Sequence, residues 1–161
     1  MQMSGCYADR VASTKLSDTE MRAWQALLHA HHQVVETLDR ELEEGHDLNL
    51  AEYDVLLRLA RAPDRALRMS ELAERVLMSP SGLTRMVDRL EGRGLVRRRE
   101  DDHDGRVTIA RLTDRGRGAL RAAARTHLRG IRRHFTDLLT EKQLRDVAAS
   151  LEAVAGPHVP H

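Results

Sequence analysis

The segment that decides the fold runs from residue 79 to residue 96 and reads SPSGLTRMVDRLEGRGLV. Its first two residues predict the start of a helix, because serine is a preferred N-cap residue and proline is tolerated at the first helical position. Glycines at 92 and 94 predict where the helix ends. Apolar residues recur between these limits at spacings of three and four, which predicts one buried stripe: Leu83, Met86, Val87 and Leu90.

The flanking sequence predicts a second helix before this one and two strands after it. Residues 70–77 read SELAERVL, with Ser70 as the expected N-cap, and only a very short turn separates them from Ser79. Residues 95–99 and 107–112 read LVRRR and VTIARL, which favours strands. A charged tip at 100–106 joins them, with Asp104-Gly105 as its turn signal. Two helices joined by a tight turn and followed by a hairpin are typical of a winged helix-turn-helix.

Helical periodicity continues on both sides of this core. Ser17 with Glu20, and Asn49 with Glu52, fit the capping-box pattern that opens a helix, and Thr113 is a further N-cap candidate. We expect additional helices at about residues 17–45, 50–61, 113–139 and 140–154. The predicted fold is therefore mostly α with a small β-hairpin wing.

Composition excludes several classes of protein. The chain has 161 residues, of which 41% are hydrophobic and 32% charged, and this predicts a packed, helix-rich domain rather than a disordered chain. A single cysteine, Cys6, suits a reducing compartment. Neither a secretory signal nor an apolar run of membrane-spanning length is visible, so we expect a cytoplasmic protein with no membrane contact.

Charge is distributed unevenly although the net charge is only +1. Residues 17–57 contain ten acidic residues and two arginines, whereas residues 58–99 contain eleven arginines and five acidic residues. Arginine suits phosphates and guanine edges, so a polyanionic partner is expected. Aromatic residues make up only 2% of the chain, too few for a platform that stacks single-stranded bases. Double-stranded DNA is the favoured partner.

The candidate DNA-binding residues lie on the second helix and on the wing. The N-terminal turn of that helix would enter a major groove and the wing arginine a neighbouring minor groove. The alternative is that these charges form an ordinary solvated surface. The residues singled out are Ser79, Ser81, Thr84, Arg85, Arg89 and, at the tip, Arg106.

These stretches resemble the DNA-binding core of the MarR family of transcriptional regulators. The resemblance rests on LRMSELA at 67–73, SPSGLTRMVDRLE at 79–91, GLV at 94–96 and DGR at 104–106 followed by Leu112-Thr113, and with the flanking helices it covers about residues 17–155. It implies a repressor that binds a palindromic operator as a homodimer. It also implies that Asp104 orients the wing arginine, Arg106. Gly105 departs from the pattern, because such regulators often carry a second arginine there.

Domain organisation follows from the same reasoning. We expect a loose leader at 1–16, a single regulator domain at 17–155 and a frayed tail at 156–161. Within the domain, a DNA-binding lobe at about 50–112 would be flanked by dimerisation helices at about 17–45 and 113–155. Apolar stripes in both terminal regions have no partner of matching length in the chain, which independently favours a dimer.

The resemblance also implies a small effector that lowers DNA affinity, commonly an aromatic acid. Trp24, His32 and Tyr53 are the candidate effector-binding residues, with packing in the dimer core as the other interpretation of Trp24. A redox sensor at Cys6 is disfavoured, because the leader offers no site that stabilises a thiolate. A metal-responsive regulator is the alternative, since His29, His32 and Glu36 share one side of a helix, although such polar stripes usually face water.

The sequence also bears on two further functional classes, an enzyme and a protein-binding scaffold. An enzyme would need convergent catalytic groups, and the acidic cluster at 101–104 with His103 lies at an expected hairpin tip with no pocket that excludes water. No enzyme, cofactor or metal site is therefore predicted. A dimeric scaffold that binds another protein through its acidic first helix is the second class. Salt-dependent binding to duplex DNA would distinguish a regulator from such a scaffold.

Overall fold

The structure is a computed structural model that describes residues 15–101 and 104–156. The described residues divide into two compact units at Val35 and Glu36, and each unit is described separately. In the first unit, the described residues form the N-terminal part of helix α1 (Asp18–His46). The predicted capping box opens it: the Ser17 backbone N–H donates to the Glu20 carboxylate at 2.8 Å, and the Glu20 N–H donates to the Ser17 hydroxyl at 3.3 Å. Trp24 and Leu28 are exposed in this part of the helix.

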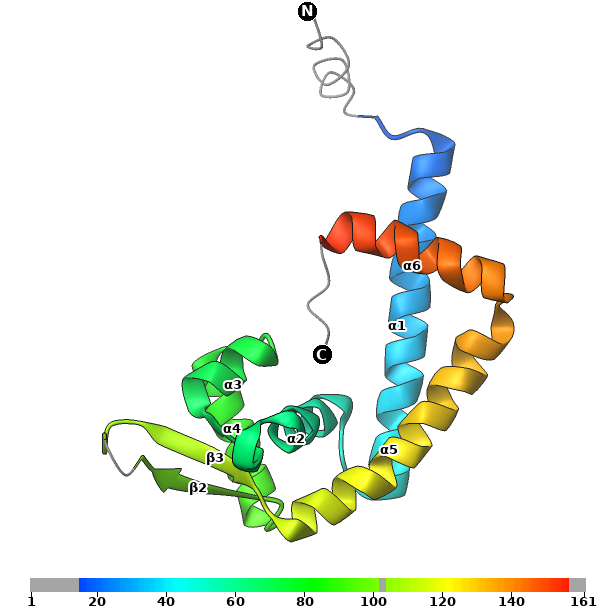
Figure 1. Cartoon of the computed structure of the whole chain (residues 1–161). Coiled ribbons are helices and arrows are strands. Elements are labelled where there is room, and N and C mark those ends of the chain that lie inside the picture. Colours follow the sequence, from blue (N-terminus) through cyan, green and yellow to red (C-terminus); the bar gives the residue numbers. More distant parts are fainter. Residues whose placement is uncertain (1–14, 102–103, 157–161) are drawn as a thin grey trace, which may run out of the picture. The chain divides into compact units, whose positions relative to one another are not determined.

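The second unit is a small helical lobe with a sheet, followed by two further helices (Figure 1). Its α2 begins at the predicted capping box, in which Asn49 Oδ1 accepts the Glu52 N–H at 2.8 Å. The elements after the end of α1 are α2 (Leu50–Arg61), a 3₁₀ turn (Pro63–Arg65), β1 (Ala66–Arg68), α3 (Met69–Arg75), α4 (Pro80–Gly92), β2 (Val96–Glu100), β3 (Thr108–Leu112), α5 (Asp114–His134), a second 3₁₀ turn (Thr136–Leu138) and α6 (Glu141–Ala155).

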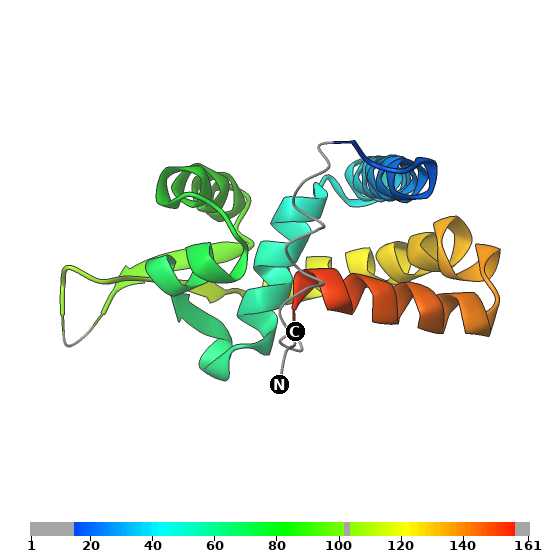
Figure 2. The same cartoon turned by 90° about the horizontal axis from the view of Figure 1, so that it is seen from above.

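The sheet has three antiparallel strands in the order β1-β3-β2. Only the hairpin was predicted from the sequence, so the prediction was incomplete: β1 also pairs with β3, with Ala66 opposite Arg111. Three residues are too few to show strand periodicity, and this strand is recognised only through its partner. The hairpin of β2 and β3 extends beyond the helices of the lobe (Figure 2). The class is confirmed as mostly α with a small winged sheet.

A continuous apolar core lies between α2, α3, α4 and the sheet. The predicted stripe of α4 is buried in it, so the opposite face of α4 is left to solvent. Helix α5 contributes Leu120 and Ala123 to this core. None of the helices in the described parts of the chain has the length and apolar character needed to cross a membrane.

Two helix boundaries differ from those predicted. Helix α3 begins directly after β1 with Arg68 as its N-cap, so Ser70 lies inside the helix and is not its cap. The helix ends at Arg75, and Leu77 takes a left-handed backbone conformation with φ +53° in the turn before α4. Helix α5 ends at His134 rather than near Leu139, because a 3₁₀ turn follows it. Local sequence signals therefore misplaced both boundaries, as is common for helix ends.

The start of α5 packs closely on the turn that follows α4. The Thr113 hydroxyl donates to the carbonyl oxygen of Gly94 at 2.7 Å and contacts that of Leu95 at 3.1 Å, while the Thr113 backbone N–H also donates to Leu95 at 3.1 Å. Gly116 is buried against the same backbone, where a Cβ would overlap the Leu95 carbonyl oxygen. This contact ties α5 to the base of the wing.

Candidate nucleic-acid interface

Helix α4 presents its predicted polar residues on one exposed face. Ser79, Ser81, Thr84, Arg85 and Arg89 are all exposed, whereas the apolar residues between them are buried. The helical period produces this division, because residues three and four apart share a face. The five residues therefore lie on a common surface that is open to solvent or to a ligand.

Hydroxyl groups at the start of α4 are partly used by the helix itself. The Ser79 side chain caps the helix by accepting the Gly82 N–H at 3.2 Å. The Thr84 hydroxyl donates to the Pro80 carbonyl oxygen at 2.9 Å, which leaves its oxygen as an acceptor toward a ligand. Arg85 is the long cationic side chain on this turn, so it has the greatest reach.

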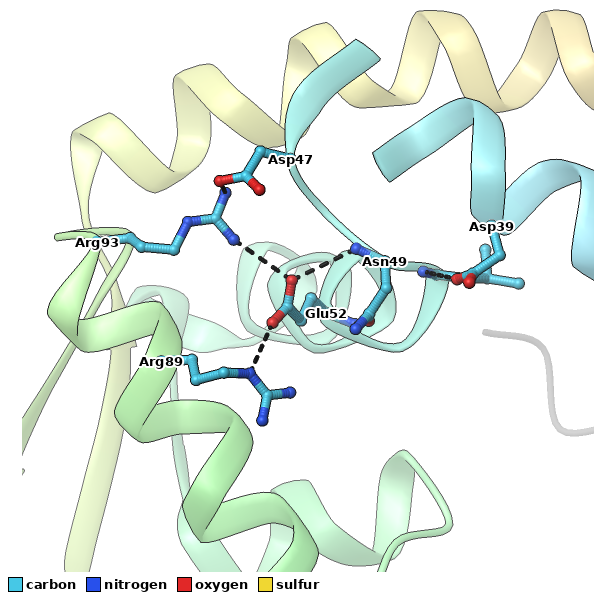
Figure 3. Close-up of polar contacts among 7 residues, drawn as sticks. Asp39, Asp47, Asn49, Glu52, Arg89 and Arg93 are labelled. Atoms are coloured by element: carbon cyan, nitrogen blue, oxygen red, sulfur yellow. Dashed lines mark hydrogen bonds and ion pairs between the residues drawn. The ribbon is translucent and has the colours of Figure 1, made fainter. Parts of the chain in front are cut away.

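The C-terminal half of α4 is joined to α2 by an ion-pair cluster that sequence analysis did not foresee (Figure 3). The Nε of Arg89 donates to Glu52 Oε1 at 3.2 Å, and Nη1 of Arg93 donates to Glu52 Oε2 at 3.3 Å. The other terminal nitrogen of Arg93 lies 3.1 Å from Asp47 Oδ2. Glu52 is buried, so the cluster holds α4 from the side of the lobe core.

The same region is joined to the C-terminal part of α1. Asp39 Oδ1 accepts the backbone N–H of Leu50, the first residue of α2, at 2.6 Å. A carboxylate at the first turn of a helix is favourable, because the N–H groups there lack partners within the helix. A chain of contacts therefore runs from α1 through the start of α2 and Glu52 to α4.

A second cluster joins α4 to the wing. The backbone N–H of Arg98 on β2 donates to Glu91 Oε1 at 2.7 Å, and its side chain contacts Glu91 Oε2 at 2.8 Å and Asp88 Oδ1 at 2.6 Å. The Arg98 backbone N–H, with the nearby guanidinium, holds the pKa of the Glu91 carboxyl below its ordinary value. Arg97 and Arg99 on either side are exposed. The strand thus uses one arginine for attachment and presents two outward.

The wing tip is organised by its aspartates in the residues that the structure describes. Asp104 Oδ1 accepts the backbone N–H of Arg106 at 3.0 Å, and the backbone carbonyl of Asp104 accepts the Val107 N–H at 2.9 Å. Both Asp104 and Arg106 are exposed. Asp104 therefore shapes the backbone that carries Arg106. Asp102 and His103 of the acidic cluster lie outside the described residues.

The predicted effector residues fall in different places. Tyr53 is buried in the core of the second unit, where its ring centroid lies 4.7 Å from that of His127, and burial raises its pKa. Trp24 and His32 belong to the first unit and are exposed. The effector assignment of these three residues stays a prediction. Cys6 lies outside the described residues.

No metal cluster emerges from the described residues. No group of three His, Cys, Asp or Glu side chains in residues 15–101 and 104–156 is placed to hold a metal ion, which includes the His29, His32 and Glu36 stripe. A groove of about 330 Å³ lies between the C-terminal part of α1 and α5. Its lining contains acidic residues, arginines, a threonine and glycines: Glu41, Glu44, Gly45, Thr126, Arg129, Gly130 and Arg133.

Comparison with known proteins agrees with this geometry. The sequence model described as the MarR family matches residues 46–107. YkoM of Bacillus subtilis, an uncharacterised HTH-type transcriptional regulator, is 30% identical over 142 residues, which cover 88% of each chain. The crystal structure of Sco3205 from Streptomyces coelicolor, a MarR family transcriptional regulator in complex with DNA, is 33% identical, with a TM-score of 0.84 over 92% of each chain. That of AbsC, a MarR family regulator from the same organism, is 32% identical, with a TM-score of 0.82 over 89% of this chain and 96% of AbsC.

The fold and the exposed face of α4, together with the DNA complex of a relative, define a winged helix-turn-helix protein that binds DNA. The matched relatives are transcriptional regulators and not enzymes. The chain belongs to the MarR family of transcriptional regulators.

Proposed function

We propose that the protein is a homodimeric repressor, acting in the cytoplasm, that binds a palindromic operator in duplex DNA and is released by a small effector. The observation that carries the proposal is the exposed face of α4 next to an arginine-bearing wing. A relative with the same fold was determined in complex with DNA, which supports DNA as the partner.

In this proposal the two parts of the surface read DNA in different ways. Arg85 on the first turns of α4 reaches a base edge in the major groove, where a guanidinium pairs with guanine through two hydrogen bonds. Arg106 enters the neighbouring minor groove, whose negative potential is strongest where A·T pairs narrow it. Ser79, Ser81, Thr84 and Arg89 contact phosphates or base edges along the same helix.

The exposed apolar side chains of the last helices support a homodimer. Helix α6 has no buried residue in the described chain, and Val154 at its end is 80% exposed. Leu138 in the preceding turn is 71% exposed. Leaving such residues in water is unfavourable by about 25 cal/mol for each Å² of apolar surface, so a second copy of the chain is the proposed partner.

Repression and release by an effector extend the proposal beyond DNA binding. MdtR of Bacillus subtilis, an HTH-type transcriptional repressor, is 35% identical over 102 residues, which supports a repressor. A flat aromatic acid is the proposed effector; Trp24, His32 and Tyr53 are the contacts predicted from the sequence, and of these Trp24 and His32 are exposed. Bound acid would hold the two recognition helices at a spacing that no longer matches successive major grooves about 34 Å apart.

DNA recognition is tested with duplexes of about 30 base pairs enriched from a random pool by the wild-type protein, compared with a scrambled duplex. Arg85→Ala should weaken binding to the enriched duplex by about 1–3 kcal/mol and relax the preference at one position. Arg106→Ala should weaken binding most at A·T-rich flanks. Arg145→Ala removes an exposed arginine of α6 and is the control: it should change neither the affinity for the enriched duplex nor the base preference. Equal losses for Arg85→Ala and Arg106→Ala on every sequence would contradict base reading.

The dimer is tested by light scattering across protein concentrations. Leu151→Asp should shift the protein to monomer, because a carboxylate would be buried in the interface without a partner. Ala149→Asp adds the same charge on the opposite side of α6 and should leave the dimer intact. A folded wild-type monomer at micromolar concentration would contradict the homodimer.

The effector is tested through the fluorescence of Trp24, the single tryptophan of the chain. Salicylate-like acids should quench this fluorescence. Operator DNA should lower the affinity of the protein for the acid by the same factor by which the acid lowers the affinity of the protein for DNA. Zinc is the competing probe. Absence of quenching by any acid, together with zinc-dependent DNA binding that His29→Ala abolishes, would replace the aromatic acid by a metal.

A further inference from the structure

Among residues 15–101 and 104–156, Glu52 is the only charged residue that is buried, with 5% of its surface exposed to solvent. It belongs to α2, yet its two carboxylate oxygens accept hydrogen bonds from Arg89 of the recognition helix α4 and from Arg93, the C-cap of α4, 37 and 41 residues later. Its Oε2 also lies 3.4 Å from the Asn49 backbone N–H as part of the helix cap. This carboxylate thus joins the start of one helix to the side of another.

Stability alone explains such a residue poorly. Burying a charge is costly, and replacing a buried ion pair by apolar residues is often neutral or stabilising. The helix cap does not need the charge either, because glutamine at the same position supplies an equivalent acceptor oxygen. The feature that requires a carboxylate is the pairing with two guanidinium groups at once.

That pairing fixes the direction of Arg89. A guanidinium is planar, and here its Nε edge faces Glu52 while its two terminal nitrogens point away from the carboxylate (Figure 3). The Arg89 side chain is 55% exposed and lies one helical turn after Arg85 on the same face of α4. Arg93 is less exposed and is held between Glu52 and Asp47. The two arginines are thus restrained in different ways: Arg89 retains an outward edge, and Arg93 anchors the end of the helix.

We propose that Glu52 is a positioning residue for DNA recognition: it binds the inner edge of Arg89, so that the outer edge is held ready for DNA, and it anchors α4 through Arg93. This inference rests on the proposed DNA-binding function of α4.

Simple electrostatics makes the opposite prediction, and this allows a test. Glu52→Gln removes a negative charge beside arginines that face a polyanion, so a pure charge effect raises the affinity for every duplex. Loss of positioning instead lowers the affinity for the enriched duplex relative to the scrambled one, since a mobile Arg89 must be ordered on binding. The ratio of the two affinities therefore separates the two effects.

The experiment measures both affinities at one salt concentration for the full-length wild type, Glu52→Gln and Asp54→Asn. Asp54 pairs with Arg58 within α2, so Asp54→Asn removes a charge of the same sign from the same helix without touching α4. We expect Glu52→Gln to lower the affinity ratio about tenfold and Asp54→Asn to leave the ratio unchanged. A ratio that is unchanged or raised in Glu52→Gln overturns the inference while DNA recognition stands.

A double-mutant cycle adds a result that a merely structural role would not produce. In an Arg89→Ala background, Glu52→Gln should lower the ratio much less than in the wild type, because the side chain that it positions is absent. An equal fall in both backgrounds overturns the inference. Arg89→Lys supplies a second variant, since one ammonium group cannot present separate edges to Glu52 and to DNA, and it should also lower the ratio. If the wild type itself does not distinguish the two duplexes, the proposed function fails and the inference fails with it.

Discussion

Gly116, at the start of α5, offers a quantitative test of how the DNA-binding lobe is joined to the long helix. A Cβ built at this position would overlap the Leu95 carbonyl oxygen and lie 2.9 Å from its carbon and 2.7 Å from Leu112 Cδ1. Carbon atoms in contact prefer about 3.5–4.0 Å, so Gly116→Ala forces the start of α5 away from the turn after α4. Two hydrogen bonds from Thr113 lie at this junction: its backbone N–H donates to the Leu95 carbonyl oxygen at 3.1 Å, and its hydroxyl donates to the Gly94 carbonyl oxygen at 2.7 Å.

The expected cost combines these effects. Overpacking costs about 1–3 kcal/mol, and each hydrogen bond lost about 1 kcal/mol. Alanine regains about 1 kcal/mol over glycine through its helix propensity. The net loss for Gly116→Ala is therefore about 2–4 kcal/mol, or a fall in melting temperature of about 5–10 °C for a chain of this size.

A matched control lies two residues along the same helix. At Gly118 nothing stands within 4 Å of an added Cβ, so Gly118→Ala should retain the gain in helix propensity and raise the stability by about 0.5–1 kcal/mol. Both variants and the wild type would be unfolded by heat and by urea at one protein concentration, because dimerisation makes the melting temperature depend on concentration. A Gly116→Ala protein that melts at or above the wild-type temperature would refute the close contact between α5 and the turn.

Three other variants test the wing tip, the tyrosine contact and the helix-turn-helix corner. Gly105→Arg should fit at the wing tip, because an added Cβ meets only Glu100 Oε2 at 3.7 Å. The new cation should steepen the slope of log affinity for DNA against log salt concentration by about 0.9, and an unchanged slope would place the tip away from phosphates. Burial lowers the pKa of His127 from its ordinary value of 6.5, so the unfolded chain binds a proton more readily than the folded chain, and stability falls as the pH drops from 6.5 toward the folded pKa. In His127→Phe the melting temperature should depend less on pH over this window, and an unchanged profile would contradict the burial of a neutral His127. Leu77 is 93% exposed and has a left-handed backbone conformation with φ +53°, which glycine adopts without strain. Leu77→Gly should therefore raise the free energy of unfolding by about 0.5–1 kcal/mol, and a lower melting temperature would mean that the Leu77 side chain is buried in the dimer.

Neighbouring residues were sufficient to predict the helix-turn-helix and the exposed face of α4. Ser79 and Pro80 set the start of the helix through the Ser79 cap, and the apolar stripe that follows determines which side is buried. The capping boxes at Ser17 and Asn49 were found in the same way. Such features are predictable because each of their hydrogen bonds joins residues three or four positions apart, so that the local sequence contains both partners.

The features that hold the recognition helix in place were decided by tertiary structure alone. Strand β1 exists because Ala66 pairs with Arg111 on β3, and Glu52, which the sequence marks only as part of a helix cap, also binds Arg89 and Arg93. Partners so far apart in the chain leave no periodic pattern, and any of the many arginines had the charge to pair with Glu52. Which of them does so depends on the positions that packing of the apolar core imposes, and those positions exist only in the folded lobe.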